Sequence, residues 1–248
     1  MYDRTWLLGE EKPEERVSLS LWLPSRRSSS LSKVSTSVVV FIPFAPECVI
    51  QYHLEVQTVR IISGKWKGTP LYTPPGRETR PTGDRVKEAL FSMIGPYFEG
   101  GVCLDLFAGS GALGLEALSR GMDFAVLVDR KSGDTIKRNV DRLNASANVK
   151  ILPFHYEKVI KQLAGAYVFD LVFLDPPYAL GLLPSVMATL VERRLLRNKA
   201  IVVAEMERNT ISPAVPSLEL VKCQDYGVTR VCIYQMTGHH EGEWEARR

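Results

Sequence analysis

Short apolar runs alternate with stretches of helical spacing from about residue 100 onward. The apolar runs cover residues 102–106, 124–128, 149–152, 170–174 and 200–204. This alternation predicts βαβ units and a mostly parallel sheet covered by helices on both faces. Two later runs, 218–222 and 230–236, leave no room for a helix between them and predict a closing antiparallel hairpin. The pattern therefore indicates an α/β fold.

Residues 1 to about 57 follow neither pattern. Several glutamates lie among the first fifteen residues, and the stretch 25–37 is rich in serine and arginine without a sustained period. Because transit peptides avoid acids, an organellar leader is disfavoured, and we expect a low-complexity or disordered extension over residues 1–58. A third option is that part of this extension lies upstream of the true start. Val59 opens the segment that reads as a compact protein, and an internal GTG codon is translated as valine.

Charge, cysteine spacing and the length of the apolar runs limit which partners and which compartment fit this chain. The formal net charge is only +3, so the basic cluster between residues 58 and 87 is more informative than the total. Such a cluster favours a polyanion such as nucleic acid, the alternative being a solvated basic face. The four cysteines form no Cys-x-x-Cys pair, which fits a reducing compartment and no zinc site. The apolar run 38–44 is too short to span a bilayer.

A glycine-rich stretch follows the first apolar run. Gly109, Gly111 and Gly114 match the pattern G-x-G-x-x-G between an expected strand and an expected helix. Such a loop turns tightly and lets a ligand approach the backbone at a helix N-terminus. Asp129 lies at the end of the next expected strand, where an acid can accept hydrogen bonds from both ribose hydroxyls. The pattern predicts a nucleoside-containing ligand.

The glycine loop alone does not identify this ligand. NAD would need its pyrophosphate at the helix N-terminus. S-adenosylmethionine carries no phosphate, and its cationic amino-acid end favours an acid just before the glycines. Asp105 occupies that place. The alternative is that Asp105 and the glycines only shape a strand-to-helix turn.

The stretch FDLVFLDPPY, residues 169–178, ends an apolar strand abruptly. Asp175 would lie at the carboxyl end of that strand, which in an open α/β sheet points into the ligand crevice. Methyl transfer to an exocyclic amine needs acceptors that hold its N–H groups and direct its lone pair. Asp175 and the Pro176 carbonyl could supply them, while consecutive prolines stiffen the loop. Tyr178 offers a ring on which a flipped-out base can stack.

Six segments follow one another along the chain: VRIISGKWKG at 59–68, RPTGDRVKEALFSMI at 80–94, LDLFAGSGALGLEALSRG at 104–121, VFLDPPY at 172–178, VVAEME at 202–207 and YGVTRV at 226–231. Taken in this order, they resemble the bacterial RsmD family of 16S rRNA methyltransferases. The resemblance covers about residues 59–236 and implies transfer of a methyl group from S-adenosylmethionine to N2 of a guanine.

The resemblance also implies a role for each matching residue. The residues expected to bind and orient the target guanine are Asp175, Pro176, Pro177 and Tyr178. Those expected to hold S-adenosylmethionine are Asp105, Phe107, Gly109, Gly111 and Asp129. The residues expected on the RNA-facing side, where basic groups position phosphates without reading sequence, are Lys65, Lys67, Arg77, Arg80, Thr82 and Arg85.

Two positions depart from the family pattern. The segment after Asp129 is about two residues shorter than usual, so another register would place Leu127 at the ribose. We keep Asp129, because a leucine cannot accept a hydroxyl hydrogen bond. At the end of the third strand, where relatives carry Asp or Asn near the adenine, this chain has Phe154, His155 and Tyr156. His155 is the candidate cofactor contact, the alternative being a solvated loop histidine.

The expected architecture is a doubly wound, mostly parallel seven-stranded sheet of the class I methyltransferase, Rossmann-like type, with its seventh strand antiparallel. This core would cover residues 81–236, after a small basic hairpin at 59–80 and before a polar tail at 237–248. Rival functions are an adenine-N6 DNA methyltransferase, an NAD-dependent oxidoreductase and a non-catalytic RNA-binding assembly factor. We expect a cytoplasmic monomer whose partner is 16S rRNA or an assembling 30S subunit, with no membrane contact and no metal site.

Overall fold

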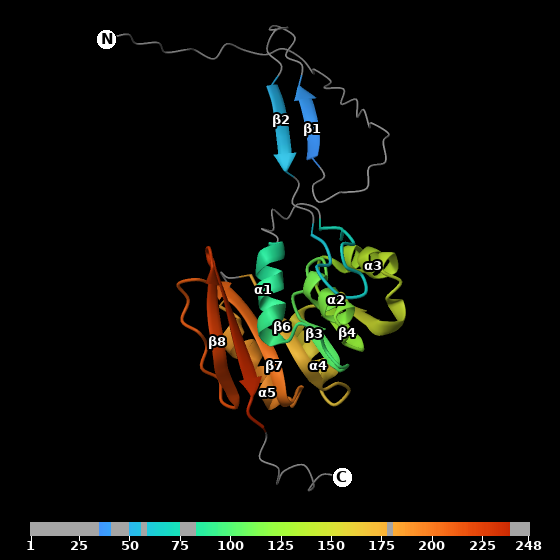
Figure 1. Cartoon of the computed structure of the whole chain (residues 1–248). Coiled ribbons are helices and arrows are strands. Elements are labelled where there is room, and N and C mark those ends of the chain that lie inside the picture. The colour runs from blue at the N-terminus through green and yellow to red at the C-terminus, as the bar shows by residue number, and fades with distance from the viewer. Residues whose placement is uncertain (1–34, 41–49, 56–58, 75–82, 178–180, 239–248) are drawn as a thin grey trace, which may run out of the picture. The chain divides into compact units, whose positions relative to one another are not determined.

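The computed structural model describes residues 35–40, 50–55, 59–74, 83–177 and 181–238. The chain divides into two compact units, Met1–Val56 and Gln57–Arg248. In the first unit, strand β1 (Ser35–Val40) pairs antiparallel with strand β2 (Ile50–Glu55) (Figure 1). This pair lies within the extension for which the sequence pattern indicated no regular element.

A seven-stranded sheet forms the centre of the second unit. Its strand order is β5-β4-β3-β6-β7-β9-β8, and β9 runs in the direction opposite to the other six strands of this sheet. All seven strands expected from the apolar runs are present, and the antiparallel strand is the last one, as predicted. The strands are β3 (Val102–Asp105), β4 (Phe124–Val128), β5 (Val149–Leu152), β6 (Phe169–Leu174), β7 (Leu196–Glu207), β8 (Leu218–Tyr226) and β9 (Thr229–Met236).

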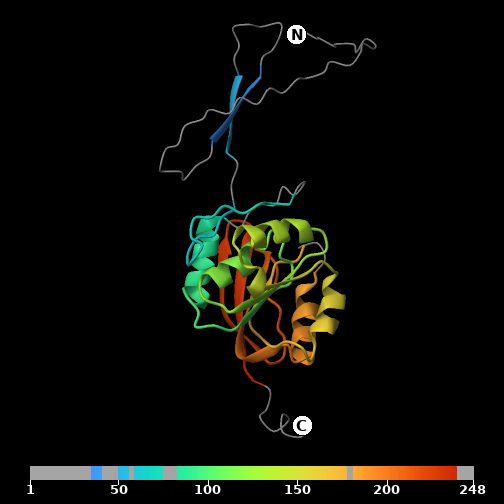
Figure 2. The same cartoon turned by 90° about the vertical axis from the view of Figure 1, so that its right-hand side faces the viewer.

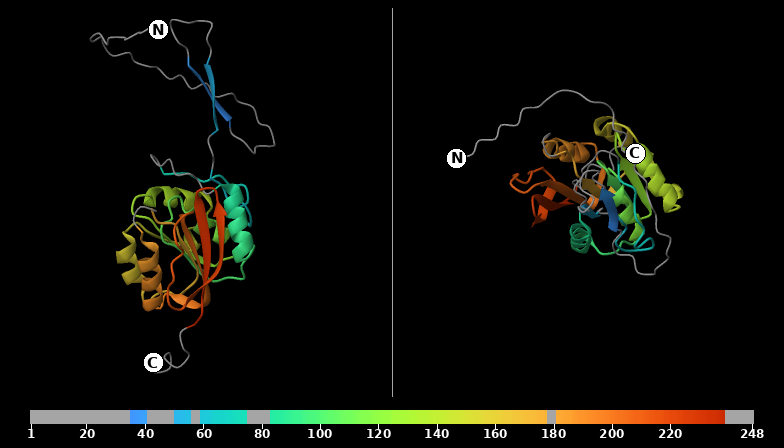
Figure 3. Two further views of the ribbon diagram at one scale, coloured as in Figure 1. Left: turned by 90° about the vertical axis from the view of Figure 1, so that its left-hand side faces the viewer. Right: turned by 90° about the horizontal axis from the view of Figure 1, so that it is seen from above.

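Helices cover both faces of this sheet, and Figures 2 and 3 show the two layers from the sides. Helices α1 (Asp84–Ile94), α2 (Ala112–Ser119) and α3 (Gly133–Arg142) pack on one face. Helices α4 (Tyr156–Leu163) and α5 (Leu183–Glu192) pack on the other, and a short 3₁₀ helix, η1 (Ser146–Asn148), precedes β5. In the described ranges, no helix is long and apolar enough to cross a membrane.

Alternation along the strands divides the core into two apolar layers. Cys103 and Phe173 face the layer of α1, α2 and α3, whereas Leu104 and Val172 face α4 and α5, and all four are fully buried. Cys103 acts as a small buried hydrophobe, and burial raises the pKa of its thiol. Because β3 and β6 are buried on both faces, they read as continuous apolar runs in the sequence.

The segment 59–71 folds back on itself as a narrow basic turn. The Ile61 N–H donates to the Thr69 carbonyl at 2.9 Å, and the Leu71 N–H donates to the Val59 carbonyl at 2.7 Å. Within residues 59–74 the two arms share one isolated bridge, between Arg60 and Pro70, and contain no regular strand. The described part of the predicted basic hairpin is therefore a hydrogen-bonded turn rather than a β-ribbon.

Glu116 anchors this turn to helix α2. Its fully buried carboxylate accepts hydrogen bonds from the backbone N–H groups of Ile62 and Ser63, at 2.7 and 2.9 Å. The same carboxylate pairs with Arg120 at 2.7 Å and with Lys87 of α1 at 3.3 Å. One buried anion thus joins the basic turn, α1 and α2, with each of its oxygens hydrogen-bonded.

A second set of contacts fixes the tip of the turn. Gly64 has a φ of 82°, and a Cβ at this position would lie 1.8 Å from the backbone oxygen of Ser119. The Lys65 N–H donates to that oxygen at 2.9 Å, and the Trp66 N–H donates to the Ser119 hydroxyl at 3.1 Å. Only glycine permits this approach of the two backbones.

Cys223 and Cys232 form a disulfide that the sequence pattern did not indicate. They are directly opposite each other in the register of β8 and β9, with a Cα–Cα separation of 4.2 Å. We expected a reducing compartment because the spacing of the cysteines indicated no pairs. Cys223 and Cys232 are paired in the structure, so the spacing argument is wrong for these two residues. The hairpin brings together residues that the sequence separates by nine positions.

Candidate functional site

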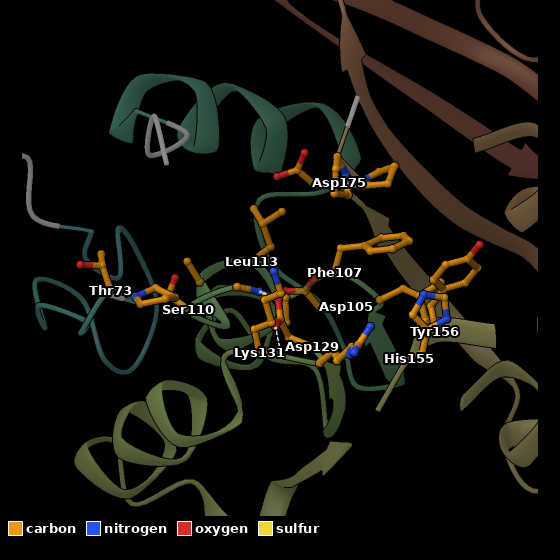
Figure 4. A pocket seen from close by; sticks show the side chains of 18 of the residues that line it. Thr73, Asp105, Phe107, Ser110, Leu113, Asp129, Lys131, His155, Tyr156 and Asp175 are labelled. Atoms are coloured by element: carbon orange, nitrogen blue, oxygen red, sulfur yellow. Dashed lines mark hydrogen bonds between the residues drawn. The ribbon is translucent and has the colours of Figure 1, made fainter. Parts of the chain in front are cut away.

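A cavity of about 520 Å³ opens at the carboxyl ends of the parallel strands. The strand order reverses between β3 and β6, which places the cavity at the topological switch point of the sheet. Figure 4 shows the labelled side chains converging on it from several loops. Among the residues predicted from the sequence, those lining the cavity are Asp105, Phe107, Gly109, Asp129, His155, Asp175, Pro176 and Pro177.

The glycine loop connects β3 directly to the first turn of α2. Gly111 precedes the helix with a φ of 80°, a left-handed conformation that favours glycine. At Gly114, one turn into the helix, a Cβ would lie 2.3 Å from a methyl carbon of Leu127 in β4. The third glycine of the motif therefore allows α2 to pack closely against the sheet.

Asp129 is held rigidly at the end of β4. One carboxylate oxygen accepts from the Gly109 N–H at 3.0 Å, and the other accepts from the N–H groups of Lys131 and Ser132 at 2.8 and 2.9 Å. These three backbone hydrogen bonds fix the carboxylate at the edge of the cavity that it lines. Leu127, the alternative in the other register, is fully buried beneath the glycine loop and does not line the cavity.

Asp105 is the most deeply buried acid of the cavity. Its carboxylate accepts from the Gly114 N–H at 3.1 Å, and the residue is only 2% exposed. Burial raises the pKa of Asp105 to about 7, the Gly114 hydrogen bond lowers it, and the negative charges of Asp175 and Asp129 raise it further. A cationic ligand placed among these three acids would favour the ionised form of Asp105.

The chain after β6 supplies the opposite wall of the cavity. Asp175 and Pro177 line it together with the buried Pro176, as predicted from the two-proline motif. Tyr178, the predicted stacking ring, lies outside the described residues. The two prolines fix φ over consecutive positions, so the described part of this wall has little conformational freedom.

Aromatic side chains form the side of the cavity near β5. The rings of Phe107 and Tyr156 lie 5.4 Å apart, and the half-exposed His155 ring lies 4.6 Å from Tyr156. His155 Nδ1 is 3.8 Å from a carboxylate oxygen of Glu157. No sequence motif marks Tyr156, because its contact with Phe107 joins segments that are distant in the chain.

The predicted RNA-facing residues are only partly within the described ranges. Lys65 and Lys67 are exposed on the basic turn, with the Lys65 ammonium 4.0 Å above the Trp66 ring. Arg85 is exposed in the first turn of α1. The remaining three, Arg77, Arg80 and Thr82, lie outside the described residues.

Other cavity residues had no motif to reveal them. Thr73 and Pro74 reach the cavity from the end of the basic turn, Ser110 lines it from within the predicted glycine loop, and Lys131 lines it just after Asp129. Figure 4 shows Thr73 and Ser110 on one side of the cavity and His155 and Tyr156 on the other. Their positions follow from tertiary packing, although proximity to Gly109 and Asp129 in the chain was a usable signal for Ser110 and Lys131.

Comparison with known proteins finds relatives that match the second unit of the chain. The family model described as conserved hypothetical protein 95 matches residues 59–235. A Haemophilus influenzae protein named "Ribosomal RNA small subunit methyltransferase D" is 35% identical over 180 residues, covering 71% of this chain and 93% of the relative. The Escherichia coli K12 protein of the same name is 37% identical over 161 residues, covering 64% and 80%.

Solved structures agree with this match. A Streptococcus pyogenes structure titled "conserved hypothetical protein" is 42% identical to this chain and superposes with a TM-score of 0.58. The superposition covers 62% of this chain and 98% of the other. The similarity thus includes the sheet, the glycine loop and the two-proline motif, and leaves the first unit unmatched.

Proposed function

Because the chain belongs to the RsmD family, it is an rRNA methyltransferase, and we propose that it methylates N2 of a guanine in 16S rRNA with S-adenosylmethionine as donor. The observation that carries this proposal is that Asp105, Asp129 and the Asp175-Pro-Pro motif line one cavity. The family match, and the small-subunit rRNA in the names of two relatives, support rRNA as the polymer that is methylated. The proposed methyltransferase domain covers residues 59–236.

The cavity is suited to S-adenosylmethionine, which when bound supplies an electrophilic sulfonium methyl group. The donor is cationic, and the buried Asp105 with its two acidic neighbours would favour its amino-acid end. Asp129, at the end of β4, would accept hydrogen bonds from the ribose hydroxyls. His155 and Phe107 would contact the adenosine from the aromatic side of the cavity, and Gly109 and Gly111 would let the ligand approach the backbone.

The chain after β6 would hold the acceptor guanine. The Asp175 carboxylate and the Pro176 carbonyl would accept from the two N–H bonds of the exocyclic amine, leaving its lone pair directed at the methyl carbon. Pro177 and Tyr178 would complete the wall against the flipped-out base. Since the prolines restrict the loop, little entropy is lost when the base is oriented.

The reaction needs no covalent enzyme intermediate. The amine lone pair forms the new N–C bond while the S–C bond breaks and its electrons remain on sulfur. The methylated nitrogen then carries an extra proton, and Asp175 or water accepts it. The rate acceleration would come mainly from positioning and from hydrogen bonds to the amine.

Exposed cations on the basic turn would position the RNA. Lys65 and Lys67 would contact phosphates without reading sequence, and Arg85 would extend this contact onto α1. The substrate would be free 16S rRNA or an assembling 30S subunit, and the enzyme would act as a monomer. Anchoring of the turn by Glu116 keeps these cations at a fixed place relative to α2.

The direct test is to map the modified base. The full-length protein is incubated with radiolabelled S-adenosylmethionine and, separately, undermodified 16S rRNA, undermodified 30S subunits and duplex DNA. We expect label on N2 of one guanine in rRNA. Label confined to DNA adenine would replace the proposal with the rival DNA methyltransferase, and protein that binds rRNA but transfers no label would favour a non-catalytic assembly factor.

A further inference from the structure

A tyrosine and two arginines form a compact cationic cluster beside the cavity. The guanidinium carbon of Arg138 lies 4.0 Å from the centre of the Tyr72 ring, and that of Arg142 lies 5.1 Å from it. Both arginines are exposed on α3, and Tyr72 is 39% exposed at the end of the basic turn. We refer to Tyr72, Arg138 and Arg142 as the α3 platform.

The backbone beneath this platform is fixed by a buried amide. Asn139, which is fully buried, accepts from the Tyr72 N–H at 2.7 Å and donates to the Tyr72 carbonyl at 2.9 Å. Its amide also donates to the carbonyl of Ser110, in the glycine loop, at 2.8 Å. One side chain therefore fixes Tyr72 relative to both α3 and the loop proposed to hold the cofactor.

The platform borders the cavity. Thr73 and Pro74, which follow Tyr72 directly, line the cavity, and so does Ser110. Figure 4 shows Thr73 and Ser110 together on one side of the cavity, and Figure 1 shows the segment 59–74 running beside α2 and α3. A strand of substrate that entered the cavity from this side would cross the α3 platform.

The charges of the platform are not neutralised within the described part of the chain. Arg138 and Arg142 are one helical turn apart, a spacing at which like charges repel. Neither guanidinium makes a described ion pair or hydrogen bond to another residue, and both contact the Tyr72 ring. Basic residues outnumber acidic ones over 130–142 as a whole. The platform therefore presents adjacent cations with unoccupied N–H donors next to a nucleotide-sized cavity.

We propose that the α3 platform binds the phosphodiester backbone of the RNA strand that flanks the target guanine. The Tyr72 ring holds the guanidiniums by their faces, which leaves their N–H edges to form paired hydrogen bonds with phosphate oxygens. Together with Lys65 and Lys67, the platform extends the phosphate contacts from the basic turn onto α3. This assignment rests on the proposed rRNA substrate and adds residues outside the motifs that indicated it.

The test measures RNA binding apart from methylation. The double variant Arg138→Gln/Arg142→Gln of the full-length protein is titrated with fluorescently labelled undermodified 16S rRNA over a range of salt concentrations. We expect a loss of affinity of at least about tenfold at low salt, and a decrease in the salt slope of about one per arginine removed. The affinity for S-adenosylmethionine should stay unchanged.

A matched control removes two cations elsewhere. Arg193 at the end of α5 and Lys222 on the edge strand β8 are both exposed, and neither belongs to α3 or to the basic turn. The double variant Arg193→Gln/Lys222→Gln has the same net charge and should bind RNA almost as the wild type does. Tyr72→Phe should also retain binding, because the ring remains, whereas Tyr72→Ala should lose part of it.

The possible outcomes separate this proposal from the proposed function. One outcome is that the wild-type protein methylates rRNA and both double variants bind rRNA as tightly as the wild type does. The proposed RNA contact of the α3 platform would then be wrong, while the proposed function would stand. If wild-type protein methylates only DNA, the proposed function fails, and unchanged rRNA affinity in the α3 variant would overturn the platform separately. An equal loss of binding to rRNA and to a poly-glutamate probe would indicate a general anion site and would also overturn the RNA assignment.

Discussion

The Asp105 carboxylate accepts a hydrogen bond from the backbone N–H of Gly114 across 3.1 Å. This contact joins the end of β3 to the first turn of α2, at a glycine where a Cβ would lie 2.3 Å from Leu127. The acid proposed to bind the cationic donor is thus held by the same close packing that shapes the loop.

Asp105→Asn should stabilise the ligand-free protein at alkaline pH. The pKa of Asp105 is about 7 in the folded chain against 3.8 in the unfolded chain, so stability falls as the pH rises from about 4 to 7 and levels off above 7, where the carboxyl is ionised in both states. The amide carries no charge and can still accept from Gly114. We expect the variant to gain on the order of 2 to 4 kcal/mol in free energy of unfolding near pH 8 and almost nothing near pH 4, measured by urea denaturation.

The same variant should bind S-adenosylmethionine more weakly, since the charge opposite the donor is lost. Isothermal titration at alkaline pH measures this effect. A variant that gains stability and keeps wild-type affinity would remove Asp105 from the cofactor site.

Binding of S-adenosylmethionine to the wild type should strengthen as the pH rises toward about 7. Below that value the ligand-free carboxyl of Asp105 is increasingly protonated, and a cationic ligand must displace the proton. Affinity should therefore rise from acidic pH and level off above the pKa. Titrations in buffers of different ionisation enthalpy should detect proton release near neutral pH, and Asp105→Asn should show neither effect.

Gly114→Ala should destabilise the fold by clashing with Leu127. The new Cβ would lie 2.3 Å from a Leu127 methyl carbon in a fully buried position, and overpacking of this kind typically costs about 1 to 3 kcal/mol. The double variant Gly114→Ala/Leu127→Ala should lose less than the sum of the single changes. Additive losses in urea denaturation would contradict the clash as the cause.

Glu116→Gln should be strongly destabilising. It removes the anion that pairs with the buried Lys87 and Arg120, and breaking a buried ion pair in this way typically costs about 3 to 5 kcal/mol. Burial already lowers the pKa of Lys87, and losing Glu116 would lower it further. Glu88→Gln, an exposed change on α1, is the control and should leave the denaturation midpoint nearly unchanged.

Asp175→Asn should reduce methyl transfer more than cofactor binding. The variant keeps one carbonyl acceptor but loses the charge that would stabilise the amine as it becomes positive, so turnover should fall about 10² to 10³-fold. Glu219→Gln, at an exposed position on β8, serves as the matched control. Single-turnover measurements with saturating S-adenosylmethionine test this expectation, and wild-type turnover would exclude Asp175 from the transfer step.

The strands and the acidic residues of the cavity were predictable for one physical reason. Parallel strands buried on both faces must be apolar, and each ends where polar residues resume, so Asp105, Asp129 and Asp175 all mark carboxyl ends. Carboxyl ends of parallel strands meet at one edge of a sheet. The sequence pattern is therefore sufficient to predict that these three acids share a cavity.

Contacts between distant side chains were not predictable in this way. The hydrogen bonds between Tyr72 and Asn139, like the bond from Ile62 to Glu116, join elements far apart in sequence. Periodicity shows which face of a helix is buried and not which residue it meets. Glu116 in particular lies among apolar neighbours of α2, where an acid has no local reason to be buried.

The disulfide is an intermediate case. The register of the predicted hairpin pairs Tyr226 with Thr229 across a two-residue turn, and continuing that register places Cys223 opposite Cys232. The pairing could have been found from the turn alone. It was missed because the cysteines were considered by their spacing in the chain rather than by their positions in the hairpin.

The reversal of strand order between β3 and β6 divides the proposed site along the chain. The residues proposed to hold the donor all precede residue 156, whereas those proposed to hold the acceptor base begin at Asp175. The two halves of the chemistry therefore reside in separate segments of the polypeptide that meet only in three dimensions. Replacing the loop after β6 with that of a relative that has another target base would then change which nucleotide is modified. The residues proposed to bind the donor would stay unchanged.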